Sequence, residues 1–427
     1  MTFYHFLRTY FLRLFFLILL CPLFSERYQI SEVSYTLDGT RERDLRRVVP
    51  VNTDRIFESK EELDSYLEDL QQRLINTRAF QDVQIESFEL GNSSDTDFTE
   101  NRSKPVSLQI TAHDSKHLLI LPYPKYDSND GLIFKIKAKD VNFFGTMNTM
   151  NAGIFAGIKE DTATGNQNLT MGAEFNYSYP FYFRDFLCSW NNNFELKYTR
   201  GVEELEFWSG TGLTFELPFQ RFSLVLDLSE QANRDLEYVQ FDDVQYFTSD
   251  INFSVPVKIF DIENWGFVFW KPFIDGKVSY DRDGISIKND DIASPVISAG
   301  QEVSTSRINW YGNFREGFSA SIGHSAGYDF MQEEFEPRFF AELQAFKCNK
   351  YLGFNSRLTA FVTKSNRGKV GNLIRGVRDE QKYLYSPELE LKTPKALKSP
   401  SAIVLNVDFP VHLITTHWLD WSDAIFG

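Results

Sequence analysis

The histidines and cysteines are the residues of this sequence best suited to metal binding or nucleophilic chemistry. His113 and His117 are four residues apart, a spacing at which a helix could direct both rings at one metal ion. The surrounding sequence is instead typical of the end of a strand, where that spacing does not bring the two rings together. Cys188 and Cys348 both lie in strand-like sequence, which predicts two isolated thiols.

The remaining composition also argues against an enzyme or a nucleic-acid-binding protein. No phosphate-binding glycine loop and no C-x-x-C pair is present, and nothing supplies a nucleophile together with its base. The formal net charge is -15, whereas binding to phosphates needs dense lysine and arginine. The sequence therefore predicts no catalytic residues, no cofactor, no metal and no nucleic-acid partner.

Residues 1–25 are expected to form a secretory signal peptide. Arg8 and Arg13 give this segment a basic start, and Leu14 to Leu20 is an unbroken apolar run. The run is shorter than the ~20 residues of a membrane-spanning helix and fits the apolar region of an export signal. A lipoprotein cleavage site is a poor match, because Leu20 stands before Cys21 where a small residue is expected.

Residues 28–113 predict a small α/β domain with the order strand, helix, helix, strand, strand. Ser59 can cap the second helix with Glu62 as its capping-box partner, and four leucines follow at helical spacing. The turn signal Asp38-Gly39 ends the first strand. The expected elements are strands at 28–37, 79–90 and 106–112, a helix at 41–48, and a second helix that begins at Ser59 and ends at Asn76-Thr77.

The segment Leu74 to Val83 resembles part of a POTRA domain, the polypeptide-transport module that precedes bacterial outer-membrane assembly barrels. It matches the pattern L-x-x-T-x-x-F-x-D-V at the end of the family's second helix. The resemblance implies that Leu74 seats the helix end on the sheet and that Phe80 and Val83 fill the core beneath it. Any junction between a helix and a strand could carry the same pattern.

From residue 118 onward the helical periodicity disappears, and strand-like segments of roughly ten residues recur between polar breaks. Aromatic residues gather near segment ends, as in Tyr177 to Phe183, where the interfacial girdles of a transmembrane barrel lie. We therefore expect residues 118–427 to form an all-β outer-membrane barrel. A soluble β-sandwich also alternates and is the alternative class, but the export signal and the lack of helices favour the barrel.

Two segments of this region resemble assembly barrels of the BamA/TamA type, the bacterial surface antigen family. Asp140 to Thr146 resembles the turn after the family's first strand, with Asp140, Asn142 and Gly145 as its residues. Glycine suits a tight hairpin there, since it tolerates positive φ. Gly371 to Val377 resembles the V-R-G-F/Y loop that folds into the lumen. Ile374, Arg375 and Gly376 match that loop, and Val377 replaces the aromatic residue.

The resemblance implies that the barrel opens beside its first strand, expected at Gly131 to Asp140, and that this strand pairs with a client strand. Its lysines are expected to face the lumen and to attract acidic client segments. The residues assigned to this strand are Leu132, Phe134, Lys135, Ile136, Lys137 and Lys139.

The predicted function is therefore assembly, insertion or translocation of other polypeptides. The expected partners are unfolded outer-membrane proteins, periplasmic or lipoprotein accessory subunits, and outer-membrane lipid, with the N-terminal domain in the periplasm. Two alternatives stay open. One is a passive porin or surface antigen without assembly activity, and the other is a two-partner secretion pore, which would be expected to carry a plug helix and two POTRA units.

The sequence departs from the family near its C-terminus. Family barrels have about sixteen strands, whereas roughly a dozen strand-like segments of barrel length are visible here. The last residues, Ala424 to Gly427, follow a charged turn rather than a strand. We therefore expect a barrel that is C-terminally incomplete, open or differently closed, and an open edge in lipid leaves backbone groups unpaired.

Overall fold

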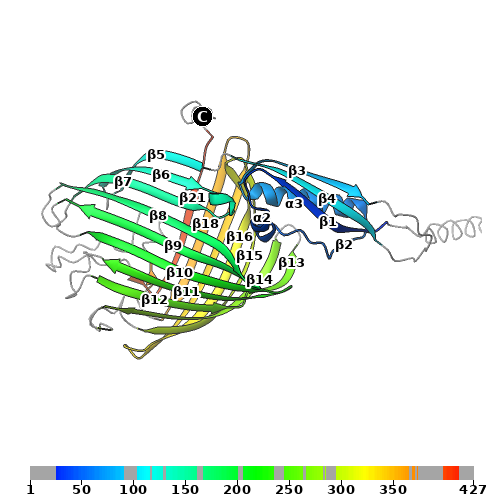
Figure 1. Ribbon diagram of the computed structural model, residues 1–427. Helices are drawn as coiled ribbons and strands as arrows, with labels where there is room; N and C mark the ends of the chain where they lie inside the picture. Colours follow the sequence, from blue (N-terminus) through cyan, green and yellow to red (C-terminus); the bar gives the residue numbers. More distant parts are fainter. Residues whose placement is uncertain are drawn as a thin grey trace, which may run out of the picture.

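The computed structural model describes residues 26–90, 103–115, 118–127, 131–160, 167–200, 205–234, 245–262, 266–281, 284, 295–364, 368–370, 373 and 398–412. The predicted signal peptide, His117 and the predicted loop motif Ile374, Arg375 and Gly376 lie outside these residues. The described chain forms a small α/β domain, which lies at one end of a large antiparallel sheet (Figure 1).

The α/β domain has one strand more than the sequence predicts. Its sheet has the order β2-β1-β4-β3, in which β1 and β4 run parallel and the other neighbours run antiparallel. Ser59 caps α3 as predicted, because its hydroxyl accepts a hydrogen bond from the backbone N–H of Glu62 at 3.2 Å. The elements are β1 (Tyr28–Leu37), α2 (Glu42–Val48), β2 (Ile56–Phe57), α3 (Lys60–Asn76), β3 (Phe80–Glu89) and β4 (Lys104–Asp114).

The core of this domain lies between the helices and the sheet. Leu74 of α3 and Phe80 and Val83 of β3, selected from the sequence as core residues, are all buried in one cluster. Leu45 of α2 joins the same cluster and is completely buried. Both helices therefore bury an apolar stripe against the sheet, which is how a short amphipathic helix gains most of its stability.

The large sheet contains fifteen strands, more than the dozen expected from the sequence. They are β5 (Leu118–Asp127), β6 (Gly131–Asp140), β7 (Met150–Glu160), β8 (Gln167–Phe183), β9 (Phe186–Thr199), β10 (Glu206–Pro218), β11 (Ser223–Arg234), β12 (Gln245–Ser254), β13 (Val257–Ile262), β14 (Gly266–Tyr280), β15 (Val296–Tyr311), β16 (Phe314–Asp329), β17 (Glu334–Cys348), β18 (Gly353–Thr363) and β21 (Ser401–Asp408).

Each strand of the large sheet pairs antiparallel with its neighbours in chain order, and β12 and β13 both pair with β14. Val255 and Pro256 separate β12 from β13, since a proline has no N–H to continue the ladder. The sheet curls strongly (Figure 1), but its terminal strands β5 and β21 do not pair with each other. The described strands thus form an open, curled sheet rather than a closed barrel.

The two faces of the large sheet differ in polarity. On one face large apolar side chains are exposed, as at Ile154, Ile322 and Ile403. The other face carries polar partners such as Lys135 and Glu174, whose side chains are less exposed, as expected on the inside of a curled sheet. The alternation predicted from the sequence is therefore present, with apolar residues outside and polar residues inside.

Candidate functional site

The loop between β6 and β7, which contains the predicted turn motif, joins the large sheet to the α/β domain. Asn142 in this loop is completely buried. Its side-chain nitrogen donates to the hydroxyl of Thr40 at 2.6 Å, and its side-chain oxygen accepts from the backbone N–H of Met147 at 2.8 Å. The hydroxyl of Thr40 in turn donates to Asp114 at 2.8 Å. One amide side chain thus connects three segments that are distant in sequence.

The same loop requires a glycine where it meets the domain. Gly145 has a φ of 71°, and a Cβ at this position would lie 2.3 Å from the carbonyl oxygen of Gly39. The backbone N–H of Arg41 donates to the carbonyl oxygen of Gly145 at 2.9 Å. The predicted tight hairpin is wrong, because β6 ends at Asp140, β7 begins at Met150, and the 3-10 turn η1 (Phe143–Gly145) lies between them.

A second contact joins the end of α3 to the turn between β15 and β16. The side-chain oxygen of Asn76 accepts from the backbone N–H of Trp310 at 2.9 Å, and the guanidinium of Arg78 lies 4.5 Å from the centre of the Trp310 ring. Asp69 on α3 forms an ion pair with Arg307 at 3.3 Å. The sequence identified Asn76 only as the end of a helix, since nothing local reveals a partner more than two hundred residues away.

A basic cleft of about 560 Å³ lies between α2 and the turn between β8 and β9. The guanidinium of Arg43 lies 3.4 Å from the centre of the Tyr182 ring, and Arg47 donates to the carbonyl oxygen of Thr146 at 3.1 Å. Behind the cleft, burial raises the pKa of the Asp44 carboxyl group, and the nearby Arg47 opposes that shift. The α/β domain and the large sheet are therefore held together by aromatic, polar and charged contacts.

The residues assigned to a client-pairing first strand lie on the second strand instead. β6 is hydrogen-bonded to β5 on one side and to β7 on the other, so its backbone is not available at an edge. Its Lys135 donates to Glu174 at 2.5 Å, and Lys137 lies 3.6 Å from the same carboxylate. These two lysines face the inside and share one carboxylate of the protein, which neutralises part of their charge.

The apolar residues of β6 occupy its other face. Leu132, Phe134 and Ile136 are all exposed there, and Lys139 continues the row of lysines on the polar face. The first strand of the large sheet is β5, and the last is β21. Apart from β13, which pairs only with β14, β5 and β21 are the only described strands of the large sheet that have a neighbour on one side alone. They therefore define the candidate site at which a strand of another polypeptide could pair.

Leu373, in the segment between β18 and β21, lies on the polar side of the sheet. The side chain of Asn406 on β21 donates to the carbonyl oxygen of Leu373 at 2.9 Å. Asn406 alternates with Leu405 and Val407, whose side chains are exposed on the apolar face, so it faces inward. Leu373 immediately precedes the predicted loop motif, and β19 (Gly368–Lys369) pairs with β20 (Lys398–Ser399) beside it.

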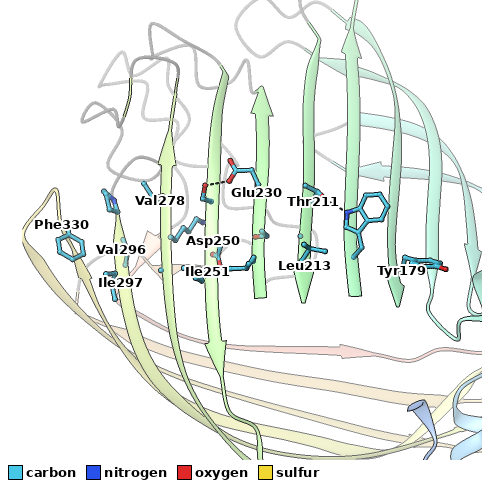
Figure 2. Close-up of a pocket in the computed structure, with 18 of the residues that line it drawn as sticks. Tyr179, Thr211, Leu213, Glu230, Asp250, Ile251, Val278, Val296, Ile297 and Phe330 are labelled. Atoms are coloured by element: carbon cyan, nitrogen blue, oxygen red, sulfur yellow. Dashed lines mark hydrogen bonds between the residues drawn. The ribbon is translucent and has the colours of Figure 1, made fainter. Parts of the chain in front are cut away.

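An apolar groove of about 840 Å³ crosses the middle of the large sheet. Figure 2 shows Leu213, Ile251 and Ile297 in one row on β10, β12 and β15, with Tyr179 and Phe330 at the two ends of the row. A continuous strip of this kind, on the face that exposes its apolar side chains, is suited to the acyl chains of lipid.

No catalytic arrangement is found among the described residues. Gly323 to Gly327 reads G-H-S-A-G and fits the pattern G-x-S-x-G. In esterases that pattern needs a strand-to-helix turn, whereas here Ser325 lies within β16 and pairs with Gly300 and Arg338 on its two sides. The part of the chain that the structure describes also holds no group of three His, Cys, Asp or Glu side chains able to bind a metal.

The remaining candidate residues are isolated. Cys188 and Cys348 are free thiols, in agreement with the sequence prediction. His113 lies 3.0 Å from the carboxylate of Asp38, at the domain surface. Within the described ranges, no helix has the length and apolar character needed to cross a membrane.

Comparison with known proteins gives matches of shape and none of sequence. No protein-family model matches the chain, and no curated protein matches it. CdiB from Acinetobacter baumannii superposes with a TM-score of 0.43 and 9 % identity, over 90 % of this chain and 68 % of CdiB. BamA from Haemophilus ducreyi lacking POTRA domains 1-3 superposes with a TM-score of 0.32 and 11 % identity, over 90 % of this chain and 85 % of that one. Neither family membership nor function follows from superpositions at this level.

Proposed function

We propose that residues 118–427 form an outer-membrane β-barrel that inserts or exports other polypeptides without enzymatic chemistry, and that residues 28–113 form a POTRA-like periplasmic domain. The observation that carries this proposal is the open pair of edges, β5 and β21, in an otherwise continuous antiparallel sheet. An apolar outer face and a polar inner face are what a strand sheet needs in lipid. Open edges would be costly there unless another strand completes the ladder.

The position of the α/β domain supports the same role. Its edge strand β3 is paired only with β4, so an extended polypeptide can add to it through main-chain hydrogen bonds. The buried Asn142 contact and the Trp310 contact hold this edge at one end of the large sheet. A polypeptide bound to β3 is thus held close to the strands that it would join. The expected partners are unfolded outer-membrane proteins, with accessory subunits and outer-membrane lipid as further candidates.

The proposal is tested in liposomes that contain the purified protein. An insertion factor speeds the folding of an added, urea-unfolded eight-stranded barrel protein, whereas a passive pore only releases small entrapped solutes. A secretion pore does neither without its dedicated exported protein. Leakage without any acceleration of folding would reject the proposal in favour of the passive channel.

The loop motif provides a substitution test of the same proposal. Arg375→Ala is expected to slow the assisted folding and to leave solute conductance nearly unchanged, because the family resemblance assigns this arginine to the inner wall. Arg378→Ala, in the same loop and with the same change of charge, is the matched control and is expected to have little effect. Equal effects of the two substitutions would remove the assigned role of Arg375.

A further inference from the structure

The hydrogen-bonding direction of each strand can be followed across the sheet from a single bond. In an antiparallel pair, alternate residues bond to the neighbour, and the residues between them turn their backbone groups to the other side. The N–H of Arg200 donates to the carbonyl oxygen of Leu169 at 2.8 Å, so the odd-numbered residues of β8 bond to β9. The even-numbered residues of β8, Glu174 among them, therefore bond to β7.

The register carries this alternation to the first strand without a shift. Glu174 bonds to its partner Gly153, so Gly153 turns its backbone away from its other partner, Lys137. Lys137 therefore bonds to Leu121 of β5. The even-numbered residues of β5 then direct their backbone groups to the open side of the sheet.

Two of these outward-facing residues are prolines. Pro122 and Pro124 have no N–H, so the middle of the open side of β5 offers carbonyl acceptors and lacks two successive donors. Proline on an edge strand, with its nitrogen turned away from the ladder, is a known means of preventing further strand pairing. Only residues toward the two ends of the strand, such as Ile120, keep a donor on this side.

The open side of β21 has the opposite character. The N–H of Thr363 donates to the carbonyl oxygen of Pro400 at 2.7 Å, and the N–H of Gly353 donates to that of Pro410 at 2.8 Å. Even-numbered residues thus bond to β18, and the odd-numbered residues face the open side. Ile403, Leu405 and Val407 are among these, and none of them is a proline. Each therefore offers both an N–H donor and a carbonyl acceptor.

The side chains of the same residues suit a membrane. Ile403 and Leu405 are 79 % and 63 % exposed, and they project onto the apolar face of the sheet. A strand added beside β21 would cover part of this surface with its own apolar side chains and complete the ladder. No described strand occupies this position.

From this asymmetry we propose that an incoming polypeptide strand pairs with the open side of β21, and that the prolines of β5 keep the first strand from competing for it. The occupant is an extended strand in which apolar and polar residues alternate, as in an unfolded outer-membrane protein. This assignment rests on the proposed insertion function. It replaces the expectation that the client pairs with the first strand.

Disulfide capture tests the assignment directly. The full chain is prepared without its native cysteines and with a single cysteine at Leu405 or at Ile120. These positions are matched, because the backbone groups of Leu405 and Ile120 face the open sides of β21 and β5, respectively. The probe is a synthetic peptide of about ten alternating apolar and polar residues, the length of a barrel strand, with one cysteine. We expect capture at Leu405→Cys to exceed capture at Ile120→Cys by about tenfold, since β5 lacks two edge donors. Equal or stronger capture at Ile120→Cys, or capture at neither position, would overturn the proposal.

Two controls separate main-chain pairing from adhesion and misfolding. A peptide N-methylated along one edge lacks the required N–H groups and is expected to be captured at neither position; capture equal to that of the parent peptide would contradict strand pairing. The double substitution Pro122→Ala and Pro124→Ala restores the missing donors of β5 and is expected to raise capture at Ile120→Cys. Unchanged capture, in protein that retains the heat-modifiable mobility of a folded barrel, would show that the prolines do not set the preference.

The outcome is separable from that of the insertion assay. Preferential capture at β21 in a protein that does not accelerate client folding would reject the insertion function and keep the assignment of the open edge. Accelerated folding together with capture at β5 would keep the function and reject the assignment.

Discussion

The buried amide of Asn142 provides the sharpest test of how the α/β domain is held. In Asn142→Ala, Thr40 loses a hydrogen bond of 2.6 Å, and the N–H of Met147 loses its acceptor. The first loss costs about 1 kcal/mol, and a partly buried N–H left without an acceptor costs about 1–3 kcal/mol. The total of about 2–4 kcal/mol corresponds to a docking equilibrium weakened by about 30- to 700-fold.

Distances between two spin labels measure this equilibrium. Labels at Glu86, on the exposed side of β3, and at Lys350, in the exposed turn after β17, report the position of the domain relative to the large sheet. The wild-type protein is expected to give one narrow distance distribution, which broadens as urea releases the domain. In Asn142→Ala the broadening is expected at a distinctly lower urea concentration.

The matched control is Asn313→Ala at the second contact. Asn313 accepts a hydrogen bond of 3.2 Å from Arg78 in an exposed setting, where water can replace it. Its removal is expected to cost less than about 1 kcal/mol and to leave the broadening almost unchanged. If the two alanine variants released the domain at the same urea concentration, the reasoning from burial would be refuted.

Three further predictions concern stability. In Gly323→Ala the new Cβ would lie 2.4 Å from the ring of Phe340, so the urea midpoint of the large sheet is expected to fall, and Phe340→Leu is expected to restore part of it. A fall that Phe340→Leu does not relieve would point to backbone contacts instead. Burial raises the pKa of Asp44, so its charged form weakens the fold at neutral pH, and this penalty disappears as the pH falls through the raised value. Asp44→Asn is therefore expected to stabilise the domain at pH 7, with a gain that shrinks toward about pH 4; a gain independent of pH would contradict the burial argument. Ser59→Ala removes the cap on the N–H of Glu62 and is expected to cost about 1 kcal/mol in urea unfolding of the domain, and no change would show that the cap does not support α3.

The local elements of this protein could be predicted because their signals lie within a few residues. Ser59 and Glu62 mark the start of α3, and the period-two alternation marks the strands of the large sheet. The turn at Asp38-Gly39 follows from the same short-range rules, whereas the burial of Phe80 was expected from the resemblance to a POTRA domain. The very short strand β2 was missed, since two residues carry no measurable periodicity.

The junction could not be predicted, although several of its residues were noticed. Asn142 and Gly145 were selected for a hairpin, and the positive φ of Gly145 agrees with that choice. Their actual role depends on Thr40 and Asp114, which reach the loop only after the domain has docked. A buried polar side chain needs partners, and a sequence does not show which distant residues supply them.

The edges of the large sheet show the same division between sequence and tertiary structure. The sequence alone determined that Pro122 and Pro124, two residues apart in one strand, turn their nitrogens to the same side, because a strand repeats every two residues. Only the tertiary structure decided that this side is open, that β5 precedes the strand expected to be first, and that β21 forms the other edge. Which backbone groups remain unpaired depends on the register of every strand pair and on which strands end the sheet, and the sequence of one strand shows neither.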